Sequence, residues 1–202
     1  MGKTEVREPK QKRSIEKKNK IIDAAFKLFC EKGFYNTNTA EIAKVAGVST
    51  GIVYSYFNDK KEIFLSAIKK YSYYISSELI TTLNSIADIS NLDEAINKIL
   101  DNLIKTHNIQ RKAHEEMEAM IHTDEDVAKF FINFENELCN SIADSISSFG
   151  INTPDIHEKV HIIYHLVENF CHEYVYHKHS SLNYDVMRTL TITTVKNILI
   201  QK

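Results

Sequence analysis

Apolar residues recur at helical spacing along most of the chain, and the strict alternation typical of strands is absent. In the first such segment, the apolar residues from Ile22 to Phe29 fall on one face of a helix predicted over about 15–32. Gly33 follows directly, where a left-handed glycine commonly ends a helix. The pattern therefore predicts an all-α protein.

Two short helices are predicted next. Asn38 and Glu41 have the spacing of a capping box, in which each side chain bonds the other residue's backbone N–H. Gly47 provides the turn that ends this helix. Ser49 is suited to cap the following helix, which we expect to end near Phe57. Two short helices joined by a tight turn are typical of a helix-turn-helix.

Longer helical segments fill the rest of the chain. Asp59 and Glu62 start the first by the same capping logic, and Thr153 is predicted to cap a later one with Pro154 at its first helical position. Together with the N-terminal helices they make about nine. The predicted segments run from about residue 60 into the 80s and over 91–106, 110–121, 123–150, 153–179 and 184–200.

Charge is distributed unevenly between the two ends of the chain. Residues 1–61 hold 13 Lys and Arg against 7 Asp and Glu, whereas the remainder holds 12 against 20, which gives the total of −2. A basic N-terminal part on an acidic body indicates that only the N-terminal part meets a polyanion such as nucleic acid.

The sequence also predicts a compartment. Cys30, Cys139 and Cys171 are scattered and form no C-x-x-C pair, which favours a reducing environment. The charged N-terminus lacks the apolar stretch of a secretion signal, and no apolar run approaches the roughly 20 residues that span a membrane. We therefore expect a cytoplasmic protein without membrane association.

The stretch GVSTGIVYSYF, residues 47–57, divides its side chains around a helix. At about 100° per residue, Val53 and Phe57 share the face that can pack inward, and Gly51 lies on the opposite face. A small residue near the start of a recognition helix lets the backbone approach base edges, and polar flanks can reach phosphates. The alternative is that Gly51 merely relieves crowding against the preceding helix.

Residues 20–64, KIIDAAFKLFCEKGFYNTNTAEIAKVAGVSTGIVYSYFNDKKEIF, resemble the DNA-binding head of tetracycline-repressor-type (TetR) regulators. The matching features are the AAxxLF-like first helix, the GF pair, the IAxxAGVS turn, the YxYF helix and the capped KKEIF. Beyond this segment the resemblance is limited to length and helix layout. It implies a basic flexible tail (1–14), a helix-turn-helix DNA-binding domain (15–62) and a helical effector-binding and dimerisation domain (63–202).

The resemblance further implies a homodimer that binds an inverted-repeat operator in double-stranded DNA and responds to a small-molecule effector. No catalysis and no cofactor are expected. Ala40 and Ile52 depart from the longer polar or smaller residues usual there, so base reading would rely on apolar contact with thymine methyls. Carried over by position, the expected DNA contacts are Thr39, Thr50, Gly51, Ile52, Tyr54, Ser55, Tyr56 and Lys60.

Two further sets of residues are candidates in the body. Aromatic and methionine side chains suit an apolar or flat effector, although each alone is more often ordinary core. The candidate lining residues are Tyr71, Tyr74, Met117, Met120, Phe131 and Phe134. The last two helices carry apolar residues on more than one side, as a two-fold dimer interface requires. The candidate interface residues are Tyr164, Phe170, Val186, Leu190 and Ile198.

Five histidines between His157 and His179 fall on one stripe of the predicted 153–179 helix. Histidines at i and i+4 are spaced to bind a metal, but a polar face of a dimerisation helix has the same pattern. The stripe lacks the closed four-ligand grouping of structural zinc, so we expect no metal there. His172 and His177 miss the H-E-x-x-H spacing by one residue, which argues against a zinc hydrolase.

The sequence therefore predicts a ligand-responsive transcriptional regulator, most simply a repressor. Two alternatives stay open at this point. One is an architectural or nucleoid DNA-binding factor without an effector, which a filled body core would favour. The other is a metal-binding protein or metalloenzyme that uses the His157–His179 stripe, which would need a bound metal with an open position and a nearby general base.

Overall fold

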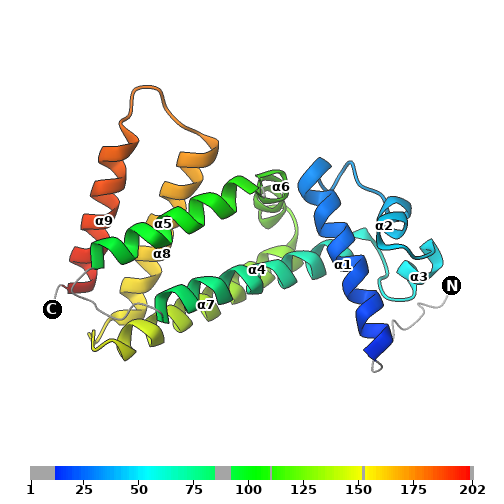
Figure 1. The fold of residues 1–202 in the computed structure, drawn as a ribbon, viewed down its shortest axis with the longest axis horizontal. Coiled ribbons are helices and arrows are strands. Elements are labelled where there is room, and N and C mark those ends of the chain that lie inside the picture. The colour runs from blue at the N-terminus through cyan, green and yellow to red at the C-terminus, as the bar shows by residue number, and fades with distance from the viewer. Residues whose placement is uncertain (1–11, 85–91, 110, 152, 201–202) are drawn as a thin grey trace. The chain divides into compact units, whose positions relative to one another are not determined.

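The computed structural model describes residues 12–84, 92–109, 111–151 and 153–200. All regular elements of the described residues are helices (Figure 1), as the sequence predicts. Their bounds are α1 Lys12–Lys32, α2 Thr39–Ala46, α3 Thr50–Tyr54, α4 Lys60–Asn84, α5 Leu92–Ile109, α6 Arg111–Ile121, α7 Glu125–Ser148, α8 Ile156–Tyr176 and α9 Tyr184–Ile200. None of these helices is both long and apolar enough to cross a membrane.

The chain forms two compact units. The head unit contains the described residues up to 73 together with 112–128, and the body unit contains those from 74 to 111 and from 129 to 200. The predicted flexible tail, 1–14, is corrected at its end because α1 begins at Lys12, and the earlier part of that tail lies outside the described residues. The predicted domain boundary between 62 and 63 stays a prediction.

The head unit is built around apolar side chains from α1 to α4. Phe29 of α1, Val53 of α3 and Phe64 of α4 are all 1% exposed or less, and the rings of Phe29 and Phe64 meet edge-on at 5.3 Å between centroids. Complete burial of one such side chain stabilises a fold by roughly 1.5–3 kcal/mol. α2 and α3 lie on one side of α1 in Figure 1, and this shared core holds them there.

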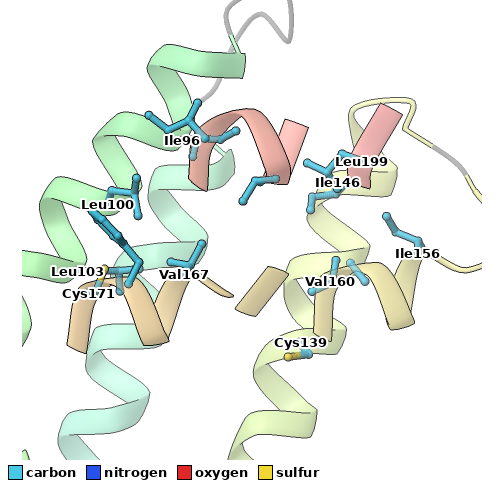
Figure 2. Close-up of a cluster of buried hydrophobic side chains, with 14 residues drawn as sticks. Ile96, Leu100, Leu103, Cys139, Ile146, Ile156, Val160, Val167, Cys171 and Leu199 are labelled. Atoms are coloured by element: carbon cyan, nitrogen blue, oxygen red, sulfur yellow. The ribbon is translucent and has the colours of Figure 1, made fainter. Parts of the chain in front are cut away.

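The body unit has a separate core to which α5, α7, α8 and α9 all contribute (Figure 2). α5, α8 and α9 pack against one another. Leu100 of α5, Val160 of α8 and Leu199 of α9 are at most 4% exposed. At the edge of this core, the Arg188 guanidinium of α9 donates to the Asp101 carboxylate of α5 at 2.8 Å.

α8 differs from its predicted bounds at both ends. It begins at Ile156 rather than at the Thr153-Pro154 pair, and the buried Thr153 hydroxyl has no hydrogen-bond partner among the residues that the structure describes. Ile156 belongs to the buried core, and this packing sets the first turn in place of the predicted cap. At the other end α8 stops at Tyr176 instead of running to His179, and the buried Tyr176 hydroxyl donates to the His107 carbonyl at 2.8 Å.

Candidate nucleic-acid interface

The turn between α2 and α3 is fixed by local bonds that the sequence predicts. The Asn38 side chain accepts from the Glu41 N–H at 3.0 Å, and the Glu41 carboxylate accepts from the Asn38 N–H at 3.1 Å, so the capping box is confirmed. Gly47 has φ +69° and ends α2 in the left-handed region. A Cβ there would meet no described atom within 4 Å, so the backbone angle and not space requires glycine.

α3 begins where predicted but ends sooner. The Ser49 hydroxyl caps it by accepting from the Ile52 N–H at 3.4 Å. Regular helix ends at Tyr54 rather than near Phe57, and a tighter turn follows in which the Tyr56 N–H donates to the Val53 carbonyl at 3.0 Å. Because Phe57 is fully buried, this turn brings the chain back into the head core.

The outer side of α3 is open. Thr50, Gly51 and Ser55 are exposed, Tyr54 is 53% exposed, and Ile52 is half-buried. Among the described residues, a Cβ on Gly51 would meet only the Ser49 hydroxyl, at 4.0 Å, so the alternative in which this glycine relieves crowding against the preceding helix does not hold. Packing within the described residues therefore does not require glycine at this position.

Tyr56 and Thr39 lie beside this open side. The Tyr56 hydroxyl is 2.8 Å from the Ser14 hydroxyl of α1, and its half-buried ring braces α3 against the start of α1. Thr39 is the half-buried first residue of α2. The first turns of α1 carry Lys12, Arg13 and further lysines, so the open side of α3 has a basic neighbour on its own unit.

Lys60 faces inward in this structure. Its ammonium donates to the Phe34 carbonyl at 2.7 Å and to the Thr37 carbonyl at 2.8 Å. Partial burial lowers the pKa of the Lys60 ammonium, and the nearby Glu116 carboxylate acts in the opposite direction. Two of its three donors therefore hold the α1–α2 connection.

Three contacts within the head unit were not predicted. The Glu116 carboxylate of α6 accepts a hydrogen bond from the Phe34 N–H in the α1–α2 connection. Lys61 at the start of α4 pairs at 2.8 Å with both Asp124 and Asp126, and these hydrogen bonds raise the pKa of the Lys61 ammonium. No sequence signal identifies such pairs, because their members lie more than 60 residues apart and the residue types are common on surfaces.

The six candidate effector residues divide equally between the two units. In the head unit, the Tyr71 ring stacks on Phe26 with centroids 3.5 Å apart, and Met120 is 5% exposed. Burial, followed by the hydrogen bond to Asp23, raises the pKa of the Tyr71 phenol to about 12. In the body unit, Phe131 and Phe134 belong to an aromatic cluster on α7. Tyr74, also of the body unit, is 60% exposed, and Met117 of the head unit is half-buried.

The candidate interface residues also differ in placement. Val186 and Leu190 of α9 are 53% and 59% exposed. Phe170 is corrected, because it is 4% exposed and belongs to the chain's own body core. Tyr164 packs partly against the same core, and Ile198 is half-buried.

The predicted histidine stripe does not behave as one set. The His157 ring meets the Asn140 side chain at 3.0 Å, and His172 lies beside Tyr176 with ring centroids 4.7 Å apart. His161 and His165 instead converge on Glu135 of α7. His179 lies beyond the end of α8.

Residues 21–67 match the family model described as bacterial regulatory proteins, tetR family. The transcriptional regulator HbdR of Aromatoleum sp. (strain CIB) is 48% identical over 54 residues, which are 27% of this chain and 24% of that protein. The fatty acid metabolism regulator protein of Bacillus subtilis (strain 168) is 43% identical over 61 residues, 30% of each chain. The matching region thus covers less than a third of the length of either relative.

Two solved structures are similar over nearly the whole chain. A transcriptional regulator assigned to the TetR family from Mesorhizobium loti MAFF303099 has a TM-score of 0.76 at 18% identity and covers 94% of this chain and 98% of its own. A protein assigned as a transcriptional regulator from Saccharomonospora viridis, in complex with choline, has a TM-score of 0.66 at 17% identity, covering 90% and 96%. At these identities the likeness shows the fold alone.

Proposed function

We propose that this chain, whose residues 21–67 match the tetR family of bacterial regulatory proteins, is a ligand-responsive, DNA-binding transcriptional repressor that acts as a homodimer. The observation that carries the proposal is the open side of α3. It presents Gly51, whose Cβ position is free, next to the basic start of α1. A short exposed helix beside clustered cations has the form of a recognition helix.

The exposed residues of α3 divide into reading and positioning roles. Gly51 admits the helix backbone to the major groove, and Ile52 contacts a base edge through its apolar side chain. Thr50, Tyr54 and Ser55 are exposed around it and supply hydroxyl groups for phosphate or base-edge contacts. Phosphate contacts set the register of the protein on DNA and carry no sequence code.

The residues that flank α3 have a second, structural role. Tyr56 and Lys60 already make hydrogen bonds inside the head, to Ser14 and to the α1–α2 connection. In the proposal they hold α3 and the connection at the correct angle, and the remaining donor of Lys60 reaches a phosphate. Thr39 at the start of α2 adds a phosphate contact, since helix N-termini favour anions.

Effector control is supported by two links within the head unit. Glu116 of α6 and Asp124 just before α7 bind the α1–α2 connection and the start of α4, respectively. A ligand that shifted α6 or the start of α7 would therefore act directly on the elements that carry α3. The Saccharomonospora viridis protein of similar fold binds choline, and we propose an apolar or aromatic small molecule for this chain.

Dimerisation is assigned to the outer face of α9. Val186, Leu190 and Ile200 are each more than half exposed and fall within an arc of about 80° at helical spacing. An exposed apolar stripe of this kind is expected where two copies meet about a two-fold axis. A dimer would place two α3 helices on successive major grooves of an inverted repeat.

The proposal is tested by selection from random DNA. Full-length protein is incubated with a library of random duplexes at moderate salt, and bound duplexes are sequenced after several rounds. A dimeric repressor enriches inverted repeats whose half-sites lie about one or two helical turns apart. Binding without any enriched sequence would favour the architectural factor, and an absence of DNA binding would overturn both.

A further inference from the structure

Glu135 of α7 and two histidines of α8 bring their ligand atoms together on the body unit. The Glu135 Oε1 atom is 3.5 Å from His161 Nδ1 and 3.2 Å from His165 Nε2, and the two Nε2 atoms are 3.3 Å apart. One ligand atom from each residue lies within 4.8 Å of both others. In the described part of the chain, this is the one such group of three His, Cys, Asp or Glu residues.

These separations match the needs of a metal centre. Zinc binds histidine nitrogen and carboxylate oxygen at about 2.0–2.2 Å, so tetrahedral ligand atoms stand roughly 3.3–3.5 Å apart. The contacts of His165 with Glu135 and with His161 already have this length. A rotation of the exposed His161 ring would bring the third pair of ligand atoms, those of His161 and Glu135, within the same range.

The chemistry of the three groups favours a late first-row cation. Neutral imidazole binds Zn²⁺, Ni²⁺ and Cu²⁺ well, and one carboxylate offsets part of the added charge. Two histidines and one carboxylate leave a coordination position for water or another ligand, unlike the closed four-ligand sites of structural zinc. The side chains of His161 and His165 are 50% and 56% exposed, so an ion could enter from and return to solvent.

We propose that Glu135, His161 and His165 bind one divalent transition-metal ion of the Zn²⁺ class per chain and so join α7 to α8. The helical pattern alone predicts no metal, because five histidines on one face of a single helix lack the closed four-ligand grouping of structural zinc. The structure selects two of them and adds a carboxylate from another helix. This site is independent of the proposed function, since it does not require DNA binding or an effector.

An ion pair is the alternative use of the same residues. A histidine that is ion-paired with the Glu135 carboxylate would satisfy these side chains without any metal. Metal titration of the purified protein separates the two uses.

The test is Zn²⁺ titration of untagged, chelator-treated full-length protein at pH 7.5 by calorimetry. Wild type should bind about one ion per chain, and His165→Ala and Glu135→Gln should each weaken binding at least about tenfold. His157→Ala is the matched control from the same stripe and should leave affinity unchanged. Circular dichroism of each metal-free variant checks that it remains folded.

A second readout is thermal stability. Because an ion that binds only the folded state stabilises it by mass action, Zn²⁺ should raise the Tm of wild type and of His157→Ala but not of His165→Ala. Wild type that takes up no stoichiometric Zn²⁺, Ni²⁺ or Cu²⁺ would overturn the proposal. So would binding that His157→Ala abolishes while His165→Ala and Glu135→Gln retain it.

Discussion

The Lys60 ammonium lies 4.2 Å from the centroid of the Phe34 ring and donates a 2.7 Å hydrogen bond to the carbonyl oxygen of the same residue. The first turn of α4 thereby closes the connection between α1 and α2. Lys60→Met removes both carbonyl bonds and the cation–π contact and should lower the free energy of unfolding by about 1–3 kcal/mol. Urea denaturation measures the loss, and Lys44→Met on the exposed side of α2 is the control.

The same lysine gives a separate prediction for DNA binding. If its third donor reaches a phosphate, Lys60→Ala weakens binding to operator and to random duplex alike. It should also lower the slope of log affinity against log salt by about one unit. Binding to both duplexes across a salt series measures this. An unchanged slope with reduced stability would leave Lys60 with its structural role only.

Gly51→Leu should leave the head folded and block DNA binding. Leucine is a better helix former than glycine, and a Cβ at this position meets only the Ser49 hydroxyl among the described residues. The added side chain would keep the α3 backbone away from base edges. Fluorescence anisotropy with operator measures the loss, and Ser77→Leu on exposed α4 is the matched control. Normal operator binding by Gly51→Leu would show that α3 does not enter the groove.

Ile52→Ala tests recognition of the DNA sequence rather than entry of α3 into the groove. Its apolar contact with a base should be worth roughly 1–3 kcal/mol of preference at one operator position. We expect the variant to lose that preference and to keep its affinity for random duplex. Competition with operators changed at single positions checks this. A uniform loss across all positions would instead assign Ile52 to positioning or to the stability of the head.

Leu190→Lys should convert the dimer to a monomer. The lysine would place its charge in the middle of the exposed α9 stripe. Burying that charge at a two-fold contact without an opposite charge is unfavourable. Sedimentation at micromolar concentration measures the change, and Ile132→Lys, at another exposed apolar residue on α7, is the control. A wild-type monomer that still binds operator would remove the dimer from the proposal.

Glu116→Ala should loosen the α1–α2 connection. The substitution removes the acceptor of the Phe34 N–H, so that amide should exchange its hydrogen faster while the body unit is unaffected. Hydrogen exchange followed by mass spectrometry measures the difference, with Glu137→Ala on exposed α7 as control. Equal protection of the connection in both variants would show that α6 does not hold it.

Local features of the head were predictable from the sequence because their partners are close along the chain. Asn38, Glu41, Gly47 and Ser49 act within five residues of their partners, and each takes its predicted place. Cap signals fail where distant packing competes with them. Thr153 is the example, because the core position of Ile156 sets the start of α8 instead.

The candidate sites also divide into features that nearby residues determine and features that distant packing determines. The exposed side of α3 follows from helical periodicity, which is a property of a few adjacent residues. The convergence of Glu135 with His161 and His165 depends on how α7 packs against α8, and helical spacing within one segment contains no information about that. The inward turn of Lys60 was missed for the same reason, since its acceptors lie 23 and 26 residues away.

The anchoring of the α1–α2 connection by Glu116 has a consequence for protein engineering. One way to exchange DNA specificity between regulators is to build a chimaera. An N-terminal segment is cut at one position and fused to a foreign C-terminal part. In this chain, a graft cut after the first helices would leave out Glu116 and the two aspartates that hold Lys61. All three carboxylates lie far beyond such a cut in the sequence. A functional transplant would have to carry 112–128 with the first helices or rebuild these three carboxylates in the recipient.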